Sequence, residues 1–344
     1  MNQITFTKPD DWHLHLRDDQ QMASVVMHTA KYYKRAIVMP NLANPVFTLE
    51  LARQYRERIL SALGNSIDFE PLMTIYLTGD TTSQQVLEVK ESGIVHAIKL
   101  YPAGATTNSA RGVRDLDQCD AVFTMMEKIG MPLAIHGEVT DSEVDIFDRE
   151  KVFIEKHLSV LVKRYPDLKI ILEHITTKDA VQFVESCSGN VGATITAHHM
   201  LLNRNNILVG GIQPHHYCLP VVKTEEDRKA VLNAATSGNP KFFLGTDSAP
   251  HARKEKESAT GKAGIYSSPV SLPIYIEMFE KENKLDQLEG FASFFGADFY
   301  SLPRNQETIT FKKEETIVPD KYEFADDYVV PLKASDTVQW KLVE

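Results

Sequence analysis

Short, continuously apolar runs recur along the chain and are separated by longer segments of mixed polarity. Runs that are apolar on both faces are typical of parallel strands buried between two layers, whereas half-exposed strands alternate apolar and polar positions. Each intervening segment can hold one helix and two loops, so the pattern predicts eight β–α units. The eight runs start near Trp12, Ala36, Glu70, His96, Pro132, Lys169, Val191 and Lys241.

Eight such units in roughly 235 residues favour an α/β fold of the (β/α)8 barrel class, the TIM barrel. An open, doubly wound sheet is the structural alternative, and the spacing of the strands alone does not separate the two. Helical periodicity is clearest over 48–63, where charged residues such as Arg53 and Glu57 share one face. The segments 120–128 and 148–165 have a similar periodicity.

Two segments depart from this alternation of strands and helices. The segment 102–112 is small, polar and glycine-bearing, so we expect a mobile loop after the fourth strand. From Glu307 onward, alternating positions predict a β-rich tail that wraps the barrel. No composition shift marks a boundary, so residues 1–344 are expected to form one domain, with a barrel core of about 12–300 and a C-terminal tail over 303–344.

Composition narrows the class of protein. Of the 344 residues, 43% are hydrophobic, and 37 basic against 47 acidic side chains give a net charge of -10. That balance argues against a general nucleic-acid binder and against anchoring on an anionic membrane, although local cations can still bind a small anion. The three cysteines are widely spaced, no apolar run is long enough to cross a bilayer, and the N-terminus does not resemble a signal peptide. These features predict a reduced, cytoplasmic protein, but they leave its twelve histidines unexplained.

Six side chains suited to chemistry fall at or near the carboxyl ends of the predicted strands. Barrel enzymes place their active sites at this end. Residues two apart in a strand face the same side, so the first two histidines of the set can face one ion. The six candidates are His13, His15, Lys99, His136, His174 and Asp247.

Each candidate alone has an ordinary explanation. A histidine in a buried strand is more often a hydrogen-bonded core residue than a ligand, His-x-His occurs often by chance, and Asp247 could cap a helix. Lys99 is different, because a buried ammonium is costly without a partner. The joint pattern at one rim is therefore far more specific than its parts.

Six motifs, in order, resemble those of the dihydroorotases, in their short bacterial form, within the amidohydrolase superfamily. The resemblance extends from the first predicted strand to the loop after the eighth, and no metal-ligand position departs from the family pattern. The motifs are DWHLHLRD (11–18), MPNL (39–42), KLYPAGATTNS (99–109), IHGE (135–138), LEHITT (172–177) and GTDSAPH (245–251).

The resemblance implies a two-zinc site, and imidazole and carboxylate ligands suit zinc. It implies that Lys99 reacts with carbon dioxide to form a carbamate (N6-carboxylysine), whose negative charge bridges both ions where an ammonium would be repelled. It assigns the more buried ion to His13, His15 and Asp247, and the other ion to His136 and His174.

The resemblance also implies the substrate pair, N-carbamoyl-L-aspartate and L-dihydroorotate. Arg17 is two residues beyond His15 and is expected to point to the same side, where its planar fork suits a carboxylate. Without the family context, an Arg and an Asn here could equally be capping or salt-bridge residues. The implied contacts are Arg17, Asn41 and His251 to the carboxylate, backbone near Leu219 and Ala263 to the ring amides, and His136.

The family mechanism implies that a hydroxide bridging the two zinc ions attacks the ring amide carbonyl, with Asp247 as general base and then acid. In the biosynthetic direction, toward pyrimidines, the ring closes with loss of water. The segment 102–112 is then expected to be a lid whose Thr106 and Thr107 hydroxyls bind substrate. The family further suggests a homodimer.

The remaining histidines and cysteines are not expected to bind metal. His198 and His199 follow the seventh predicted strand, where adjacent side chains would point in opposite directions. Cys187 and Cys218 are interpreted as buried apolar side chains rather than nucleophiles.

Three other functions compete with this interpretation. Another cyclic amidohydrolase, such as a hydantoinase or an allantoinase, would share the metal ligands, so Arg17, Asn41 and His251 are the discriminating residues. A non-catalytic barrel should have lost ligands, and all six are present. A phosphate-binding barrel would need a glycine-rich loop after the seventh or eighth strand, which the sequence lacks.

Overall fold

The computed structural model describes residues 2–64 and 68–343. Eight strands form one sheet in chain order, each parallel to the next, as the apolar runs predict. The strands are β2 (Asp11–Leu14), β3 (Arg35–Val38), β4 (Glu70–Tyr76), β5 (Val95–Leu100), β6 (Leu133–Ile135), β7 (Ile170–Leu172), β8 (Val191–Ile195) and β9 (Phe242–Leu244).

The sheet closes on itself into a barrel. The Asp247 backbone N–H donates to the His13 carbonyl at 2.8 Å, and the His15 N–H donates to the Ser248 carbonyl at 3.1 Å. Leu14 and Ser248 form a parallel bridge. These bonds join the first strand to the segment that follows the last, so the fold is the (β/α)8 barrel and not the open, doubly wound alternative.

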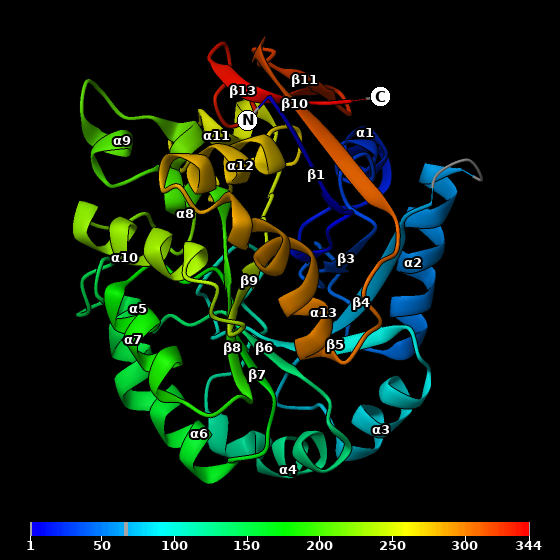
Figure 1. The fold of residues 1–344 in the computed structure, drawn as a ribbon. Helices are drawn as coiled ribbons and strands as arrows, with labels where there is room; N and C mark the ends of the chain where they lie inside the picture. Colours follow the sequence, from blue (N-terminus) through cyan, green and yellow to red (C-terminus); the bar gives the residue numbers. More distant parts are fainter. Residues whose placement is uncertain (1, 65–67, 344) are drawn as a thin grey trace.

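Helices surround the barrel and connect its strands (Figure 1). The predicted helix over 48–63 is α2, and Thr48 is its N-cap, with the hydroxyl accepting from the Leu51 N–H. The predicted segment 148–165 is helical but passes through a π-helical turn, Ile154–Leu158. The α-helices are α1 (Asp19–Ala30), α2 (Leu49–Leu63), α3 (Ser83–Glu91), α4 (Asp120–Ile129), α5 (Arg149–Phe153), α6 (Ser159–Arg164), α7 (Lys178–Ser186), α8 (Ala197–Leu201), α9 (Asn205–Leu208), α10 (Glu225–Thr236), α11 (Arg253–Lys256), α12 (Ser271–Lys281) and α13 (Phe295–Tyr300).

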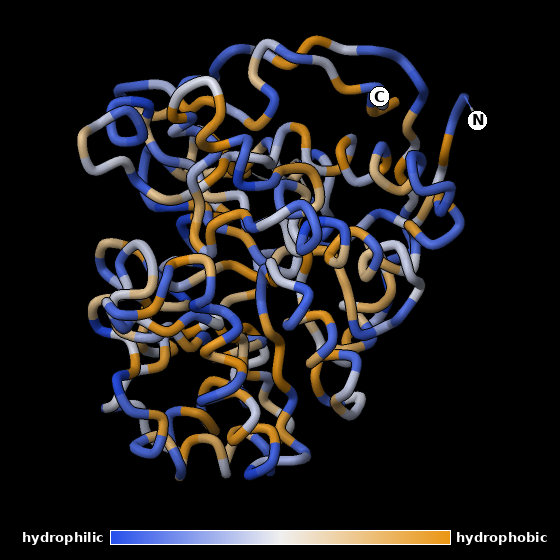
Figure 2. The backbone as a smooth tube through the Cα atoms, turned by 90° about the vertical axis from the view of Figure 1, so that its left-hand side faces the viewer, coloured by the Kyte–Doolittle hydropathy of each residue, from blue (hydrophilic) through white to orange (hydrophobic). Residues whose placement is uncertain are grey.

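Two apolar clusters hold the barrel together. The larger one lies between the strands and the surrounding helices. The smaller one fills the barrel interior, where Trp12 stacks on Tyr300 of α13 with ring centroids 4.7 Å apart. The hydrophobic stretches of the strands accordingly run through the middle of the molecule (Figure 2). The packed interior leaves the carboxyl ends of the strands as the place for polar chemistry.

The predicted β-rich tail is present, and it pairs with a strand that the sequence pattern did not predict. β10 (Thr308–Ile317) lies between β1 (Gln3–Thr7) and β13 (Thr337–Leu342), antiparallel to both. β11 (Tyr322–Phe324) and β12 (Asp327–Val329) form a separate hairpin. The two ends of the chain therefore meet in one small sheet at one end of the molecule (Figure 1).

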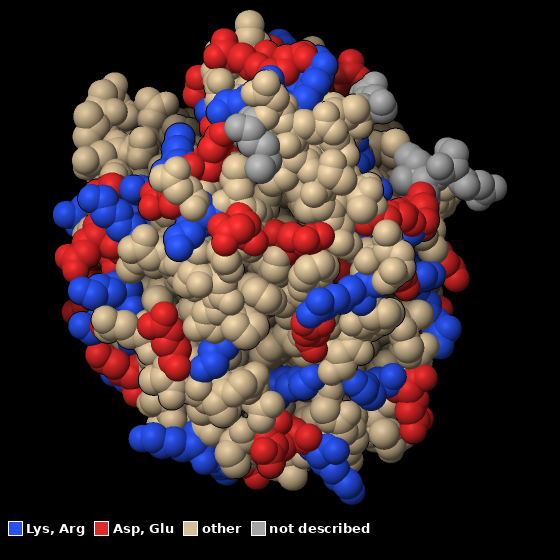
Figure 3. Space-filling view, in the orientation of Figure 1, with Lys and Arg blue, Asp and Glu red and all other residues tan. Residues whose placement is uncertain are grey.

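The surface carries mixed charge. Acidic and basic side chains are interspersed over the face shown in Figure 3. Among the described residues, no helix combines the length and apolar character needed to cross a membrane.

Candidate active site

Three predicted ligands converge where β2 and the segment after β9 meet. The Nε2 atoms of His13 and His15 are 3.3 Å apart, and they lie 3.3 Å and 3.1 Å from Oδ1 of Asp247. His15 follows the last residue of β2, yet it faces the same side as His13, as the spacing predicted. The three atoms form a nearly equilateral triangle, which is the arrangement of three ligands on one face of a tetrahedral ion.

A second group of side chains adjoins this triangle. The ring of His174, two residues beyond β7, lies 4.9 Å from the ring of His13 and 4.8 Å from that of His136. His136 Nε2 is 2.8 Å from Oε2 of Glu138. Nδ1 of His174 is buried and has no hydrogen-bond partner among the described residues. The barrel thus brings both predicted ligand groups together.

Lys99 is fully buried on β5. Its Nζ forms a close ion pair with Oε2 of Glu173 and lies 4.7 Å from the ring centre of Tyr101. Burial lowers the pKa of Lys99, and the Glu173 carboxylate opposes that shift. The sequence suggested no partner for the buried ammonium of Lys99, and the structure shows that Glu173 is that partner.

Glu173 is the site residue that sequence reasoning missed. Its Oε1 also lies 2.9 Å from Nδ1 of His13, so one carboxylate contacts both a predicted histidine ligand and Lys99. Burial would raise its pKa, but His13 and Lys99 outweigh that effect and lower the pKa of Glu173 to about 2. The sequence contains one signal for this role: Glu173 comes directly before His174, at the end of a strand expected to be buried, where a charged side chain needs a partner.

The two neighbouring histidines have opposite pKa shifts. Burial disfavours the charged form of His13, yet the carboxylates of Glu173 and Asp247 raise its pKa to about 9. Burial dominates at His15, and the pKa of that side chain falls to about 4. Burial would raise the pKa of Asp247, but His13 and His15 hold it well below its usual range. The carboxylate is therefore ionised and able to bind a cation.

Buried polar groups hold the loops that carry these ligands. The carboxylate of Asp11 accepts the backbone N–H groups of His13, at 3.2 Å, and of Thr246, at 2.8 Å. The His174 N–H donates to Oγ1 of Thr194 at 2.7 Å. These bonds tie the loop before Asp247 to β2 and the loop at His174 to β8.

Three site residues have strained backbones. Arg17, His174 and Asp247 have φ values of 63°, 44° and 44°, in the left-handed region that side chains with a Cβ rarely adopt. Such strain of about 1–3 kcal/mol each persists only where the surrounding structure holds it, and it concentrates at functional sites. Arg17 lines the same cavity as His13 and His15, as expected, although β2 ends at Leu14 and the chain turns at this left-handed residue.

The predicted substrate residues surround the same small cavity. Nε of Arg17 donates to the Pro250 carbonyl at 2.7 Å, and its Nη2 lies 2.9 Å from Nε2 of His251. Lys99 and His251 are not among the lining residues: Lys99 contacts Glu173, which contacts the lining residue His13, and His251 contacts the lining residue Arg17. The other predicted residues line the cavity directly: His13, His15, Arg17, Asn41, Thr106, Thr107, His136, His174, Leu219, Asp247 and Ala263.

The loop over 102–112 lies against this cavity. Nδ2 of Asn41 donates to the Thr107 carbonyl at 3.0 Å, and Nδ2 of Asn108 donates to the Asn41 carbonyl at 3.0 Å. Asn41 therefore holds the loop as well as lining the cavity.

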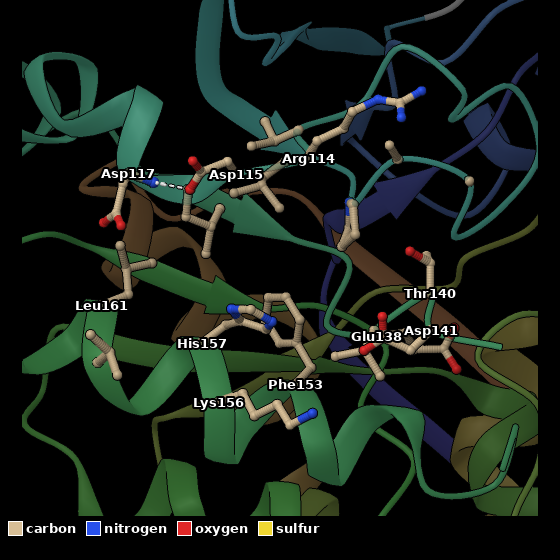
Figure 4. A pocket seen from close by; sticks show the side chains of 18 of the residues that line it. Arg114, Asp115, Asp117, Glu138, Thr140, Asp141, Phe153, Lys156, His157 and Leu161 are labelled. Atoms are coloured by element: carbon tan, nitrogen blue, oxygen red, sulfur yellow. Dashed lines mark hydrogen bonds between the residues drawn. The ribbon is translucent and has the colours of Figure 1, made fainter. Parts of the chain in front are cut away.

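A larger cavity of about 860 Å³, seen from close by in Figure 4, is lined in part by the same loop, at Pro102, Ala103, Gly104 and Ala110. Its wall combines the segment around Asp115 with Lys156, His157 and Leu161 of the helical region after β6. Glu138 lines this cavity and also contacts His136, so the two spaces are neighbours. None of the predicted site residues faces this larger space.

The donor set fits divalent metal ions. Two imidazoles and one carboxylate form a triangle, a buried nitrogen of His174 is unpaired among the described residues, and the buried Lys99 is paired with Glu173, which also contacts His13. Imidazole and carboxylate are the ligands that zinc and similar ions take at catalytic sites.

Comparisons with known proteins agree with this geometry. The model of the Amidohydrolase family matches residues 6–330. A dihydroorotase of Nitrosomonas eutropha is 57% identical over 343 residues, covering 99% of each chain. Another, of Microcystis aeruginosa, is 56% identical over the full length of both.

Solved structures show the same relationship. A dihydroorotase of Campylobacter jejuni superposes with a TM-score of 0.92 at 34% identity, covering 100% of this chain and 98% of that one. One of Saccharomyces cerevisiae, in complex with 5-fluoroorotic acid, has a TM-score of 0.90 at 31% identity, covering 100% and 99%. An L-hydantoinase of Arthrobacter aurescens, at 14% identity and a TM-score of 0.77, shares the fold alone.

Proposed function

This chain belongs to the amidohydrolase family, as one of its dihydroorotases, and from that membership we propose how its residues interconvert N-carbamoyl-L-aspartate and L-dihydroorotate. The hydantoinase and non-catalytic alternatives are wrong, because full-length relatives at more than half identity are dihydroorotases and hydantoinases are distant. The residue roles rest on one observation, the triangle of side-chain atoms from His13, His15 and Asp247.

Two zinc ions are proposed as the cofactors. His13, His15 and Asp247 would hold one ion, and His136 and His174 the other. Lys99 would join both after adding carbon dioxide at Nζ: the ammonium first loses a proton, and a second proton leaves as the neutral amine adds carbon dioxide to give an anionic carbamate. When bound, the ions supply Lewis-acid activation of the amide carbonyl and of the attacking water.

Arg17 is proposed to bind the carboxylate that substrate and product share. Its guanidinium is held by the Pro250 carbonyl and packs against His251, so its orientation is set before substrate arrives. Burial lowers the pKa of His251 to about 3, so this neighbour is neutral and leaves the positive charge to Arg17. Asn41 and the backbone near Leu219 and Ala263 complete the binding surface.

Asp247 is proposed to move the proton. In hydrolysis its carboxylate accepts a proton from the attacking water and delivers it to the ring nitrogen as the amide bond breaks. In the direction of ring closure the same carboxylate takes the proton from that nitrogen and passes it to the departing oxygen, which leaves as water after taking one more proton from solvent. Its strained backbone and its contacts with both histidines fix its position.

We further propose that the enzyme is a cytoplasmic homodimer, an expectation from the family resemblance. Light scattering after gel filtration tests the dimer, and a mass of one chain at micromolar concentration would contradict it.

Substrate discrimination tests the proposed roles. Purified enzyme with zinc should hydrolyse L-dihydroorotate far faster than dihydrouracil, the same ring without the carboxylate. Arg17→Gln should raise the KM for L-dihydroorotate at least about tenfold, because a charge-assisted bond is lost. Lys99→Ala should lose metal and turnover together, whereas the surface variant Lys178→Ala should keep both. Faster turnover of the uncharged ring, or full metal content in Lys99→Ala, would contradict the assignments.

A further inference from the structure

A separate group of metal-binding side chains lies beside the active site. His198 and His199 are in α8, directly after β8, and Cys218 lies in the segment before α10. Each offers one ligand atom, the three atoms lie within 4.8 Å of one another, and all three residues are buried. None of them belongs to the ligand set proposed for catalysis.

The geometry around Cys218 matches part of a tetrahedral coordination sphere. Its Sγ is 3.7 Å from Nε2 of His199 and 3.3 Å from the Pro220 carbonyl oxygen, which is itself 3.0 Å from that Nε2. Zinc bonds of about 2.0–2.3 Å to N, O and S place neighbouring ligand atoms about 3.3–3.8 Å apart. These three atoms therefore need only small shifts to share one ion.

His199 is also oriented as a metal ligand would be. Its Nδ1 lies 2.8 Å from Oγ1 of Thr196, the N-cap of α8, which leaves Nε2 directed toward Cys218. Histidine ligands make such a hydrogen bond through the ring nitrogen that does not bind the metal, and this bond fixes their tautomer and the plane of the ring.

His198 provides the independent evidence. It is 0% exposed, and neither of its ring nitrogens has a hydrogen-bond partner among the described residues. A simple hydrogen-bond network can explain the other two side chains, because both can donate to the Pro220 carbonyl. It leaves His198 with two buried and unsatisfied polar atoms, which is costly unless something binds them.

The expectation that His198 and His199 point in opposite directions is wrong, because they lie in a helix and not in a strand. Adjacent helical side chains are separated by about 100°, so both can approach one point from the same turn. Their ring centres are 4.5 Å apart.

We propose that His198, His199 and Cys218, with the Pro220 carbonyl oxygen, form a third cation site, for a divalent ion of the zinc class. The thiol of Cys218 loses its proton to solvent as the ion binds, and the resulting thiolate supplies negative charge to a buried cation. Cys218 lines the active-site cavity, which gives the ion a path to the site. The ion would fix the segment that carries Leu219, where the backbone is proposed to contact the ring.

Cobalt spectroscopy tests this site separately from catalysis, because the proposed catalytic ligands include no sulfur. The full-length enzyme is dialysed against Co²⁺ until its metal has exchanged, and its absorption spectrum and cobalt content are measured. We expect a near-ultraviolet thiolate-to-cobalt charge-transfer band and one more ion per chain than in Cys218→Ser. His198→Gln should weaken binding of this ion at least about tenfold.

Cys119→Ser is the matched control, because it removes another buried thiol and should leave the band unchanged. Circular dichroism checks that each variant folds. If the unmodified enzyme, with cobalt bound, shows no thiolate-to-cobalt band, the proposal is overturned, whether or not the variants fold. A band that persists in Cys218→Ser, or an equal cobalt content in that variant and the unmodified enzyme, overturns it as well.

Discussion

Glu173 and Lys99 show how one buried pair organises the site. An ammonium and a carboxylate that are both removed from water stabilise each other only while both remain, because loss of either partner leaves an uncompensated buried charge. Glu173 also contacts His13, so the same carboxylate orients a proposed ligand. Conversion of Lys99 to a carbamate would remove its positive charge, and the Glu173 carboxylate would then be paired with His13 alone.

His251 makes a pH-dependent contribution to stability. Its folded pKa of about 3 lies below the ordinary value of 6.5, because burial and Arg17 disfavour the imidazolium. As the pH falls below 6.5 the unfolded chain takes up a proton that the folded chain does not, so the free energy of unfolding decreases. His251→Gln should remove up to about 1.4 kcal/mol per pH unit of this slope, measured by urea unfolding between pH 5 and 7. An unchanged slope would contradict the lowered pKa.

At the scale of elements, short helices hold the loops that carry the ligands. Glu150 of α5 is buried, and its carboxylate accepts hydrogen bonds from four donors, the backbone N–H and the hydroxyl of both Thr176 and Thr177. Those threonines lie between His174 and α7, whose N-cap is Thr177, so α5 fixes the chain directly after a proposed ligand.

Glu150→Ala should therefore destabilise the fold by about 3 kcal/mol, because buried donors lose a charged acceptor. Chemical denaturation measures the change, and metal affinity should fall as the loop at His174 loosens. Glu155→Ala, an exposed residue of the same helical segment, is the control and should change stability by less than about 0.5 kcal/mol. An equal loss of stability in the two variants would show that the hydrogen bonds to Glu150 contribute nothing specific.

The loop over 102–112 is the second such element. Thr106 and Thr107 line the cavity, and Asn41 and Asn108 link the loop to the segment after β3. Replacing both threonines by alanine should lower kcat about tenfold or more while metal content stays unchanged, because their hydroxyls are proposed to contact substrate. Steady-state kinetics with metal analysis tests this, and unchanged turnover would remove the loop from catalysis.

At the scale of the whole molecule, barrel closure assembles the site from the first barrel strand and the segment after the last one. His13 comes from the first barrel strand and Asp247 from the segment after the last, more than two hundred residues apart. Their backbones are hydrogen-bonded to each other, so an ion held by both side chains ties the closure point together.

Removal of metal should therefore lower stability as well as abolish activity. Free metal at about a thousand times its dissociation constant stabilises a folded chain by about 4 kcal/mol. Chelator-treated enzyme should unfold at a lower temperature in calorimetry, and added Zn²⁺ should restore both properties. Lost activity with an unchanged unfolding temperature would show that the ions do not stabilise the closure.

The local pattern of residues was enough to predict the eight strands, the helix over 48–63 and the six candidate ligands, because apolar periodicity and residue type are properties of short segments. It did not reveal the partner of Lys99, the pairing of β1 with β10, or the approach of His198 and His199 to Cys218. Those contacts join residues that are distant along the chain, or they depend on whether a segment becomes a helix or a strand. Tertiary packing decided them: the packed barrel brings the buried polar groups into one site, and the pairing of β1 with β10 joins segments from the two ends of the chain in a separate sheet.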